Sequence, residues 1–377
     1  MKKTLLLGAV ALMASTAMAQ VSEPTLTSLF VNTTSIPASR YGTGYNGKVY
    51  TSETGKIYQW ENANNATTFS IDTYGNAAIA TDEAGNIILN QGLWGTGATN
   101  WCIVSATDKT QTPFTITVPE GLTSGYVHQI GSVVGNVLSE KGGYMAFAYN
   151  NATKAIVVKI AKGEVVNTYV STELNTEVFA AYSNAGIVVP ALSTVEEYEA
   201  VDNPANHIYW RKRTVGNIYY FNDNLETKYF PLPAEAQANG EGFDVFTLNN
   251  VTYAVYPYKA TEPKSSYGDG FLIANLKTGE TILTQESPVN ASSGKYYGSL
   301  DAQVINGTTA YIYHYSNATC AAAYKFEVPN NDPTAIEVIE AENAPVEYYN
   351  LQGVKVANPE KGLFIKKQGN KATKVVL

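Results

Sequence analysis

Gly270–Glu286 reads GFLIANLKTGETILTQE: an apolar run, a short polar turn and a second run rich in β-forming residues. This pattern predicts a β-hairpin. The same pattern recurs in four other segments, namely Lys56–Ile71, Asn100–Val118, Ala155–Val170 and Asn217–Leu232. Successive copies start roughly 45–60 residues apart, a period typical of propellers and other repeat arrays.

Strand-like runs and turns fill the chain from Val21 to Val328 and predict an all-β protein whose main part is a β-propeller. In each blade the repeated hairpin supplies the third and fourth strands, counted from the centre. We expect six blades, or seven if the crowded segment Glu177–Leu232 contains an extra one. The sixth blade lacks a fourth strand of its own, and Leu26–Thr33 is predicted to supply it and close the ring. A pair of β-sandwiches is the alternative.

Composition supports short strands joined by tight turns. The 377 residues include 27 tyrosines and 30 glycines, and only 15% are charged, below the average for soluble domains. A net charge of −8 argues against a nucleic-acid partner, because phosphate binding needs a basic patch. The two cysteines, Cys102 and Cys320, lie in apolar runs and are predicted to be buried free thiols.

Residues 1–19 have the features of a secretory signal peptide. Lys2 and Lys3 precede the apolar run Leu5–Met13, and Ala17-Met18-Ala19 provides a small-residue cleavage site before Gln20. The apolar run is too short for a membrane anchor, and no later run approaches 18 apolar residues. We therefore expect an exported protein without a transmembrane segment, found at the cell surface, outside the cell or in the periplasm.

The composition changes at Pro329–Pro333, so residues 20–329 are predicted to form the propeller and residues 330–377 a small C-terminal β unit. The end of the chain contains Tyr349-Asn350-Leu351-Gln352-Gly353, Lys361-Gly362-Leu363-Phe364-Ile365 and Lys374-Val375-Val376. These motifs resemble the C-terminal sorting domains of exported Bacteroidetes-type proteins. That resemblance implies recognition by a type IX secretion machinery and attachment at, or release from, the cell surface.

Motifs for catalysis or metal binding are missing from the sequence. The three histidines, His128, His207 and His314, are far apart and have no metal-ligand spacing, and His314 is predicted to be a packed or surface side chain. No nucleophile elbow or phosphate-binding loop occurs. We expect no cofactor and no metal. Asp244, Asp269 and Asp301 are the remaining catalytic candidates, since a glycosidase needs only two carboxylates that meet across a channel.

Long loops with exposed aromatic residues are better candidates for binding. In a propeller, the connections between second and third strands share one face with the connections between blades. By this rule Thr34–Asn46, Gln91–Asn100, Lys259–Gly270 and Ser287–Gly298 lie on one face, and the opposite face has tight turns apart from Pro190–Asn206. Tyr and Trp in such loops can stack on sugar rings or anchor a protein. The predicted ligand-binding residues are Arg40, Tyr41, Tyr45, Trp94, Tyr267, Asp269, Tyr296 and Tyr297. The alternative is that these aromatic residues pack between blades.

The sequence thus favours an exported, monomeric, non-enzymatic propeller that binds a glycan or an envelope protein at the cell surface. Two alternatives remain open. One is a propeller enzyme that acts on polysaccharide through carboxylates at the channel mouth, and the other is a scaffold for envelope assembly. A carboxylate pair in a funnel would favour the enzyme, and a broad flat apolar face would favour the scaffold.

Overall fold

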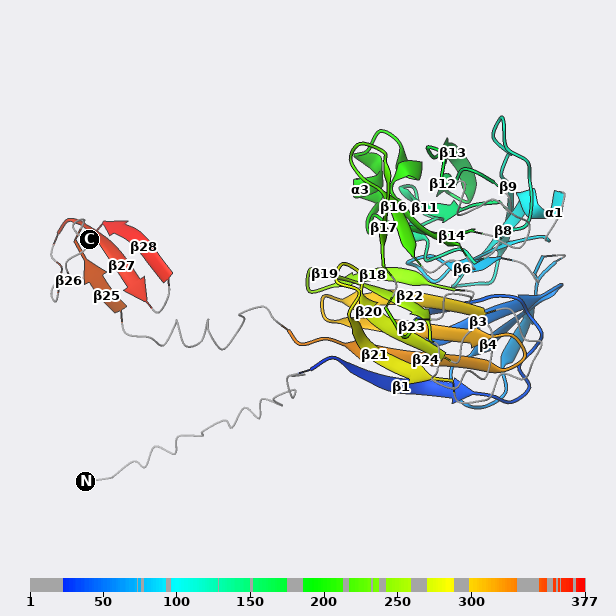
Figure 1. Ribbon diagram of the computed structural model, residues 1–377, viewed down its shortest axis with the longest axis horizontal. Helices are drawn as coiled ribbons and strands as arrows, with labels where there is room; N and C mark the ends of the chain where they lie inside the picture. Colours follow the sequence, from blue (N-terminus) through cyan, green and yellow to red (C-terminus); the bar gives the residue numbers. More distant parts are fainter. Residues whose placement is uncertain are drawn as a thin grey trace, which may run out of the picture. The chain divides into compact units, whose positions relative to one another are not determined.

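Four-stranded antiparallel sheets make up nearly all of the regular structure (Figure 1). The computed structural model separates Glu23–Val328 from a second unit that contains the C-terminal residues. The structure describes residues 23–72, 74–75, 78–92, 96–127, 129–149, 152–174, 186–212, 217–231, 233–236, 242–258, 270–287, 298–330, 346–350, 355–356, 359, 361–368 and 371–376. The predicted signal peptide lies outside these residues.

The described part of Glu23–Val328 forms six four-stranded sheets, which we call blades 1 to 6, each named from its innermost strand outward. Blade 1 consists of β2 (Gly42–Tyr45), β3 (Lys48–Glu53), β4 (Lys56–Trp60) and β5 (Thr67–Ser70). Blade 2 consists of β6 (Ile79–Thr81), β7 (Ile87–Asn90), β8 (Asn100–Val104) and β9 (Gln111–Thr115). Blade 3 consists of β10 (Val134–Asn136), β11 (Gly142–Phe147), β12 (Ile156–Ala161) and β13 (Glu164–Val170).

The remaining blades follow the same plan. Blade 4 consists of β14 (Gly186–Pro190), β15 (Ile208–Lys212), β16 (Ile218–Phe221) and β17 (Thr227–Phe230). Blade 5 consists of β18 (Asp244–Leu248), β19 (Val251–Pro257), β20 (Gly270–Asn275) and β21 (Thr281–Glu286). Blade 6 consists of β22 (Gly298–Asn306), β23 (Thr309–Ser316), β24 (Cys320–Glu327) and β1 (Thr25–Asn32). Among the described residues, short helices occur in two connections, namely α1 (Thr96–Thr99) between β7 and β8, and α3 (Val195–Glu199) with η1 (Pro204–Asn206) between β14 and β15.

The all-β propeller predicted from the hairpin repeat is confirmed. Each of the five repeated segments contains the third and fourth strands of a blade, as expected. The N-terminal strand also lies where the sequence predicts it, because β1 pairs antiparallel with β24 from Thr25–Glu327 to Asn32–Ala321 and completes blade 6 (Figure 1). Blade 6 therefore joins the two ends of Glu23–Val328.

The blades are held together by apolar residues buried between them. Six hydrophobic clusters are found among the described residues, and each joins two neighbouring blades, including blade 6 to blade 1 and blade 1 to blade 2. Middle strands such as β7 and β11 are buried along their whole length because both of their faces meet another blade. This packing excludes the alternative of two β-sandwiches.

The second unit contains a four-stranded sheet in the order β26-β25-β27-β28. Its strands are β25 (Val346–Tyr349), β26 (Lys355–Val356), β27 (Leu363–Gln368) and β28 (Lys371–Val376). The sequence predicts three or four short strands here.

Both cysteines of the chain are buried free thiols in blades 2 and 6, as predicted, and burial raises the pKa of Cys102 to about 11.

Candidate functional site

A cavity of about 480 Å³ lies at one end of the central channel. All six blades line it: inner strands β2, β6, β10, β14, β18 and β22 contribute, together with Ser132 and Val133, which lead into β10. The lining includes Tyr45, Glu83 and Thr247, which lie where an inner strand turns into the second strand of its blade. The cavity therefore opens on the face of the tight turns between the first and second strands, and not on the face predicted for binding.

Two carboxyl groups meet at the base of this cavity. Asp244, the first residue of β18, lines the cavity, and Asp301 of the neighbouring strand β22 is hydrogen-bonded to it. The hydroxyl of Ser132 lies 3.2 Å from Asp244 Oδ2 and 2.9 Å from Asp301 Oδ1. Both aspartates are almost fully buried. Two of the three aspartates that the sequence singled out thus come together, because neighbouring inner strands converge on the channel.

Neighbouring backbone and hydroxyl groups hold this pair in place. Asp244 Oδ2 accepts a hydrogen bond from the Ala302 amide at 2.9 Å, and Asp301 Oδ2 accepts from the Thr43 hydroxyl at 2.7 Å and the Gly44 amide at 2.9 Å. Burial, followed by the adjacent Asp301 carboxyl, raises the pKa of Asp244 well above its usual value of 3.8.

The cavity walls combine aromatic rings with small polar groups. Tyr45, Tyr209 and Phe246 contribute rings, and hydroxyl and amide groups come from Ser132, Ser193, Thr247, Thr252 and Gln303. The acidic lining residues are Asp82, Glu83 and Asp244. The described lining contains no Lys, Arg or His. Such a surface offers ring faces and hydrogen-bonding groups without positive charge.

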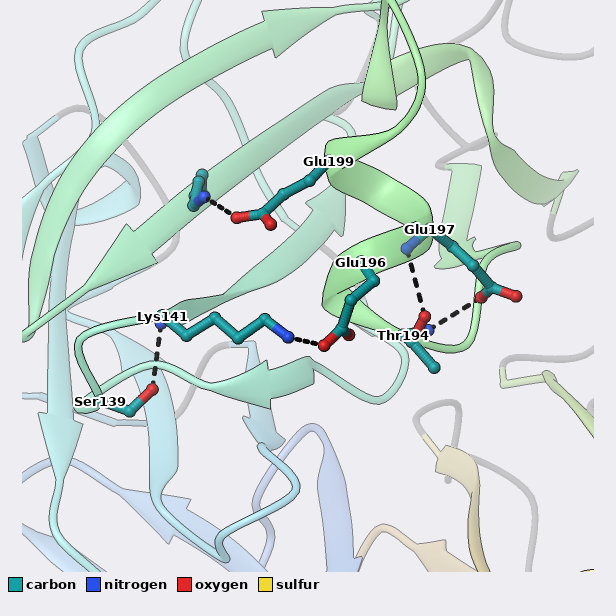
Figure 2. Close-up of polar contacts among 8 residues, drawn as sticks. Ser139, Lys141, Thr194, Glu196, Glu197 and Glu199 are labelled. Carbon is teal, nitrogen blue, oxygen red and sulfur yellow. Dashed lines mark hydrogen bonds and ion pairs between the residues drawn. The ribbon is translucent and has the colours of Figure 1, made fainter.

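One wall comes from the connection between β14 and β15. The sequence predicts this connection as the one long turn on this face. Pro190–Ser193 lines the cavity and leads into α3. Thr194 caps this helix: its hydroxyl accepts from the Glu197 amide at 3.2 Å, and the Glu197 carboxylate accepts from the Thr194 amide at 3.0 Å (Figure 2). This capping box stabilises a helix of only five residues.

Blade 3 anchors α3 from outside the cavity. Lys141 and Lys159 of blade 3 form ion pairs with Glu196 and Glu199, which point from the helix toward that blade (Figure 2). Between them the buried ring of Tyr198 stacks on Tyr144 at 4.8 Å, and its hydroxyl donates to the His207 carbonyl at 3.0 Å. These contacts make Pro190–Ser193 a fixed wall.

Three of the eight predicted ligand-binding residues are described, and they do not lie together on a long loop. The predicted loop Thr34–Asn46 is corrected, because Gly42–Tyr45 is strand β2. Gly42 and Gly44 lie directly against the rings of Tyr315 and Tyr313 in blade 6, so the absence of side chains permits an inner strand where the sequence resembles a loop. Tyr45 ends this strand and lines the cavity.

Arg40 and Tyr41 lie at the other end of β2. Tyr41 is 1% exposed in the cluster between blades 1 and 2, and its hydroxyl lies 2.8 Å from that of Tyr126. Its ring therefore packs between blades, which is the alternative stated for these aromatic residues, and is not available for stacking on a ligand. The half-buried Arg40 lies over the Tyr126 ring, with its carbon Cζ 5.5 Å from the ring centre.

The other predicted ligand-binding residues lie outside the described part of the chain: Trp94, Tyr267, Asp269, Tyr296 and Tyr297. Sequence reasoning missed Ser132, Tyr209 and Gln303, which have no local motif. Two features of the sequence belong to residues of this cavity or its walls. They are the aspartates of the inner strands and the unusual length of the turn Pro190–Asn206. Asp82 lies in the turn between β6 and β7, where its carboxylate accepts from the amides of Ala84 and Asn86 at 2.9 Å.

His314 is a packed side chain, as predicted. It is 9% exposed between blades 5 and 6, where its ring meets Phe271 edge-on, and burial lowers its pKa to about 4. Within the described ranges, no group of three or more His, Cys, Asp or Glu side chains is placed to hold a metal ion. The described helices are too short to cross a membrane.

Comparisons with known proteins support the fold. No protein-family model matches the chain, and no curated protein matches it. A DUF4623 family protein from Bacteroides eggerthii has a similar structure, with 12% identity and a TM-score of 0.51 over 81% of this chain and 75% of that one. Virginiamycin B lyase from Staphylococcus aureus, in a catalytically inactive form with quinupristin, gives 11% identity and a TM-score of 0.43 over 81% and 100%. A mutant of AofleA from Arthrobotrys oligospora gives 9% and 0.48 over 94% and 92%. At 12% identity, the likeness to the Bacteroides eggerthii protein concerns the fold alone.

Proposed function

We propose that this protein is an exported, non-enzymatic β-propeller that binds a neutral glycan at the cell surface, with the central cavity as its binding site. The observation that carries the proposal is the lining of this cavity, where Tyr45 and Tyr209 lie near the hydroxyl groups of Ser132 and Thr247. Sugar rings present apolar C–H faces that pack on aromatic rings and hydroxyl groups that need hydrogen-bond partners. The cavity provides both kinds of contact.

The charge of the lining supports a neutral ligand. Glu83 and Asp244 are acidic, and the described lining lacks a basic side chain. A glycan that carries carboxylates or sulfates would bring negative charge next to Glu83 without a compensating cation. We therefore expect neutral sugars to bind better than acidic ones.

The carboxyl pair favours binding over glycoside hydrolysis. Asp244 and Asp301 are hydrogen-bonded to each other, whereas the two carboxyl groups of glycosidases are about 5–9.5 Å apart so that the scissile bond fits between them. Backbone amides already occupy oxygens of both side chains. In this proposal the pair supports the base of the cavity and does not react with the ligand.

Export belongs to the same proposal. Residues 1–19 act as the signal peptide, and the C-terminal motifs present the protein to a secretion machinery, which attaches it to or releases it at the cell surface. Removing residues 331–377 should keep the protein inside the cell envelope. Fractionation of cells that express the full and the shortened chain tests this, and equal surface exposure of the two chains would contradict it.

A glycan array probed with the mature chain, residues 20–377, tests the binding proposal. We expect neutral glycans to bind and Ser193→Trp to reduce their affinity at least tenfold, because the indole would occupy the rim of the cavity. The matched control is Thr284→Trp on the exposed outer strand β21, which should bind like the unchanged protein. Glycan binding that is unaffected by Ser193→Trp would place the site elsewhere, and binding of acidic glycans alone would contradict the charge argument.

A further inference from the structure

Three polar side chains buried in one interface make no hydrogen bond within the part of the chain that the structure describes. They are the side-chain amide of Asn90, the indole N–H of Trp101 and the hydroxyl of Tyr149. All three residues are completely buried. Neither nitrogen nor oxygen of the Asn90 amide has a partner. Buried polar groups are nearly always hydrogen-bonded, so three unpaired side chains in one interface need an explanation.

The three side chains lie at the same end of the interface between blades 2 and 3. Asn90, the last residue of β7, is directly opposite Trp101 in the register of β7 and β8, so both side chains point to the same face of the sheet. The Trp101 ring lies 5.6 Å from the ring of Phe147, and Phe147 lies 5.3 Å from Tyr149. Trp101, Phe147 and Tyr149 belong to the cluster that joins the two blades.

The hydrogen-bonding capacities of these groups are complementary to water. Asn90 offers two donors and an acceptor, Trp101 one donor, and Tyr149 a hydroxyl that both donates and accepts. A water molecule has two donors and two acceptors and in protein interiors makes about three hydrogen bonds. The three side chains can therefore satisfy one or two water molecules, whereas an apolar occupant would leave the Asn90 amide unpaired.

We propose that blades 2 and 3 enclose a buried hydration site, in which Asn90, Trp101 and Tyr149 hold one or two ordered water molecules. The water links the end of β7 to blade 3. The site is separate from the central cavity, and the proposal does not depend on glycan binding.

The sign of the stability change in Tyr149→Phe tests this proposal. This substitution removes only a hydroxyl group, so the water loses a partner, and we expect the Tm of the mature chain to fall by at least about 2–4 °C. If the interface is dry, the same substitution removes a buried, unpaired hydroxyl and leaves the packing unchanged. An unchanged or higher Tm would therefore overturn the proposal.

A matched control and a direct observation complete the test. Tyr229→Phe removes the same hydroxyl from a residue that is 60% exposed on the outer strand β17, and it should not lower the Tm. A high-resolution crystal structure of the unchanged protein should show water within hydrogen-bonding distance of Asn90 Nδ2 and Tyr149 Oη. An interface without such water would refute the site.

Discussion

Gly44 illustrates how single residues determine the inner ring of this propeller. A Cβ atom at this position would lie 1.9 Å from Cγ of Tyr313 in the next blade, far closer than van der Waals contact. Its amide also donates to Asp301 at 2.9 Å, so the backbone cannot withdraw without loss of that hydrogen bond. Close packing of β2 against blade 6 thus depends on the absence of a side chain.

Gly44→Ala should therefore lower the free energy of unfolding by about 1–3 kcal/mol, the usual cost of overpacking a core. Urea denaturation followed by tryptophan fluorescence measures the change. Gly307→Ala is the matched control, because a Cβ atom there meets no atom within 4 Å. Equal effects of the two substitutions would show that the contact with Tyr313 is relieved without cost.

Asp244 makes a pH-dependent contribution to stability. Its pKa in the folded chain is raised above the ordinary value of 3.8, so in the range between the two values the folded chain holds a proton that the unfolded chain has released. This contribution is complete below about pH 4 and is lost as pH rises toward the pKa of the folded state. Asn at this position cannot titrate, so Asp244→Asn should remove this part of the pH dependence.

Chemical denaturation from pH 4 to pH 8 measures this effect. The difference in unfolding free energy between the unchanged protein and Asp244→Asn should shift in favour of the variant as pH rises. The exposed Asp223 provides a control, because Asp223→Asn should leave the slope unchanged. A constant difference across this range would mean that Asp244 is already ionised in the folded protein.

At the scale of elements, β1 closes the ring. It pairs with β24 over eight residues, with a bulge between Ser28 and Phe30, and Phe30 packs into the cluster that joins blades 6 and 1. Without β1, the backbone edge of β24 and the apolar side chains beneath it would be exposed. Unpaired edges of this kind promote aggregation.

A chain that starts at Thr34 should therefore be insoluble or unfold at a much lower temperature than a chain that starts at Glu23. Expression followed by gel filtration and thermal melting distinguishes them, and the longer chain controls for loss of the residues before β1. Equal melting temperatures would show that blades 5 and 1 already hold the three remaining strands of blade 6 in place.

On the scale of the whole molecule, the six blades and the clusters between them lie entirely within Glu23–Val328. Removing residues 331–377 should therefore leave the melting temperature of the propeller unchanged within about 2 °C, which is less than 1 kcal/mol for a domain of this size. Circular dichroism measures it, with the full mature chain as reference. A large decrease would mean that the C-terminal unit contributes to the stability of the propeller.

The hairpin repeat and the apolar middle strands were readable from the sequence alone, because strand period, turn residues and burial on both faces are local properties of the chain. The partner of β24 followed from counting strands, since blade 6 lacked a fourth strand and Leu26–Thr33 belonged to no other blade. Other features depend on contacts between distant blades. Tyr41 resembles a loop residue but packs between blades, and Asp244, Asp301 and Ser132 meet only because three inner strands converge on one channel. The cavity and its position on the turn face were decided by the tertiary structure. Closing the ring brings together residues from all six blades, and the sequence around each of these residues contains no motif for a binding site.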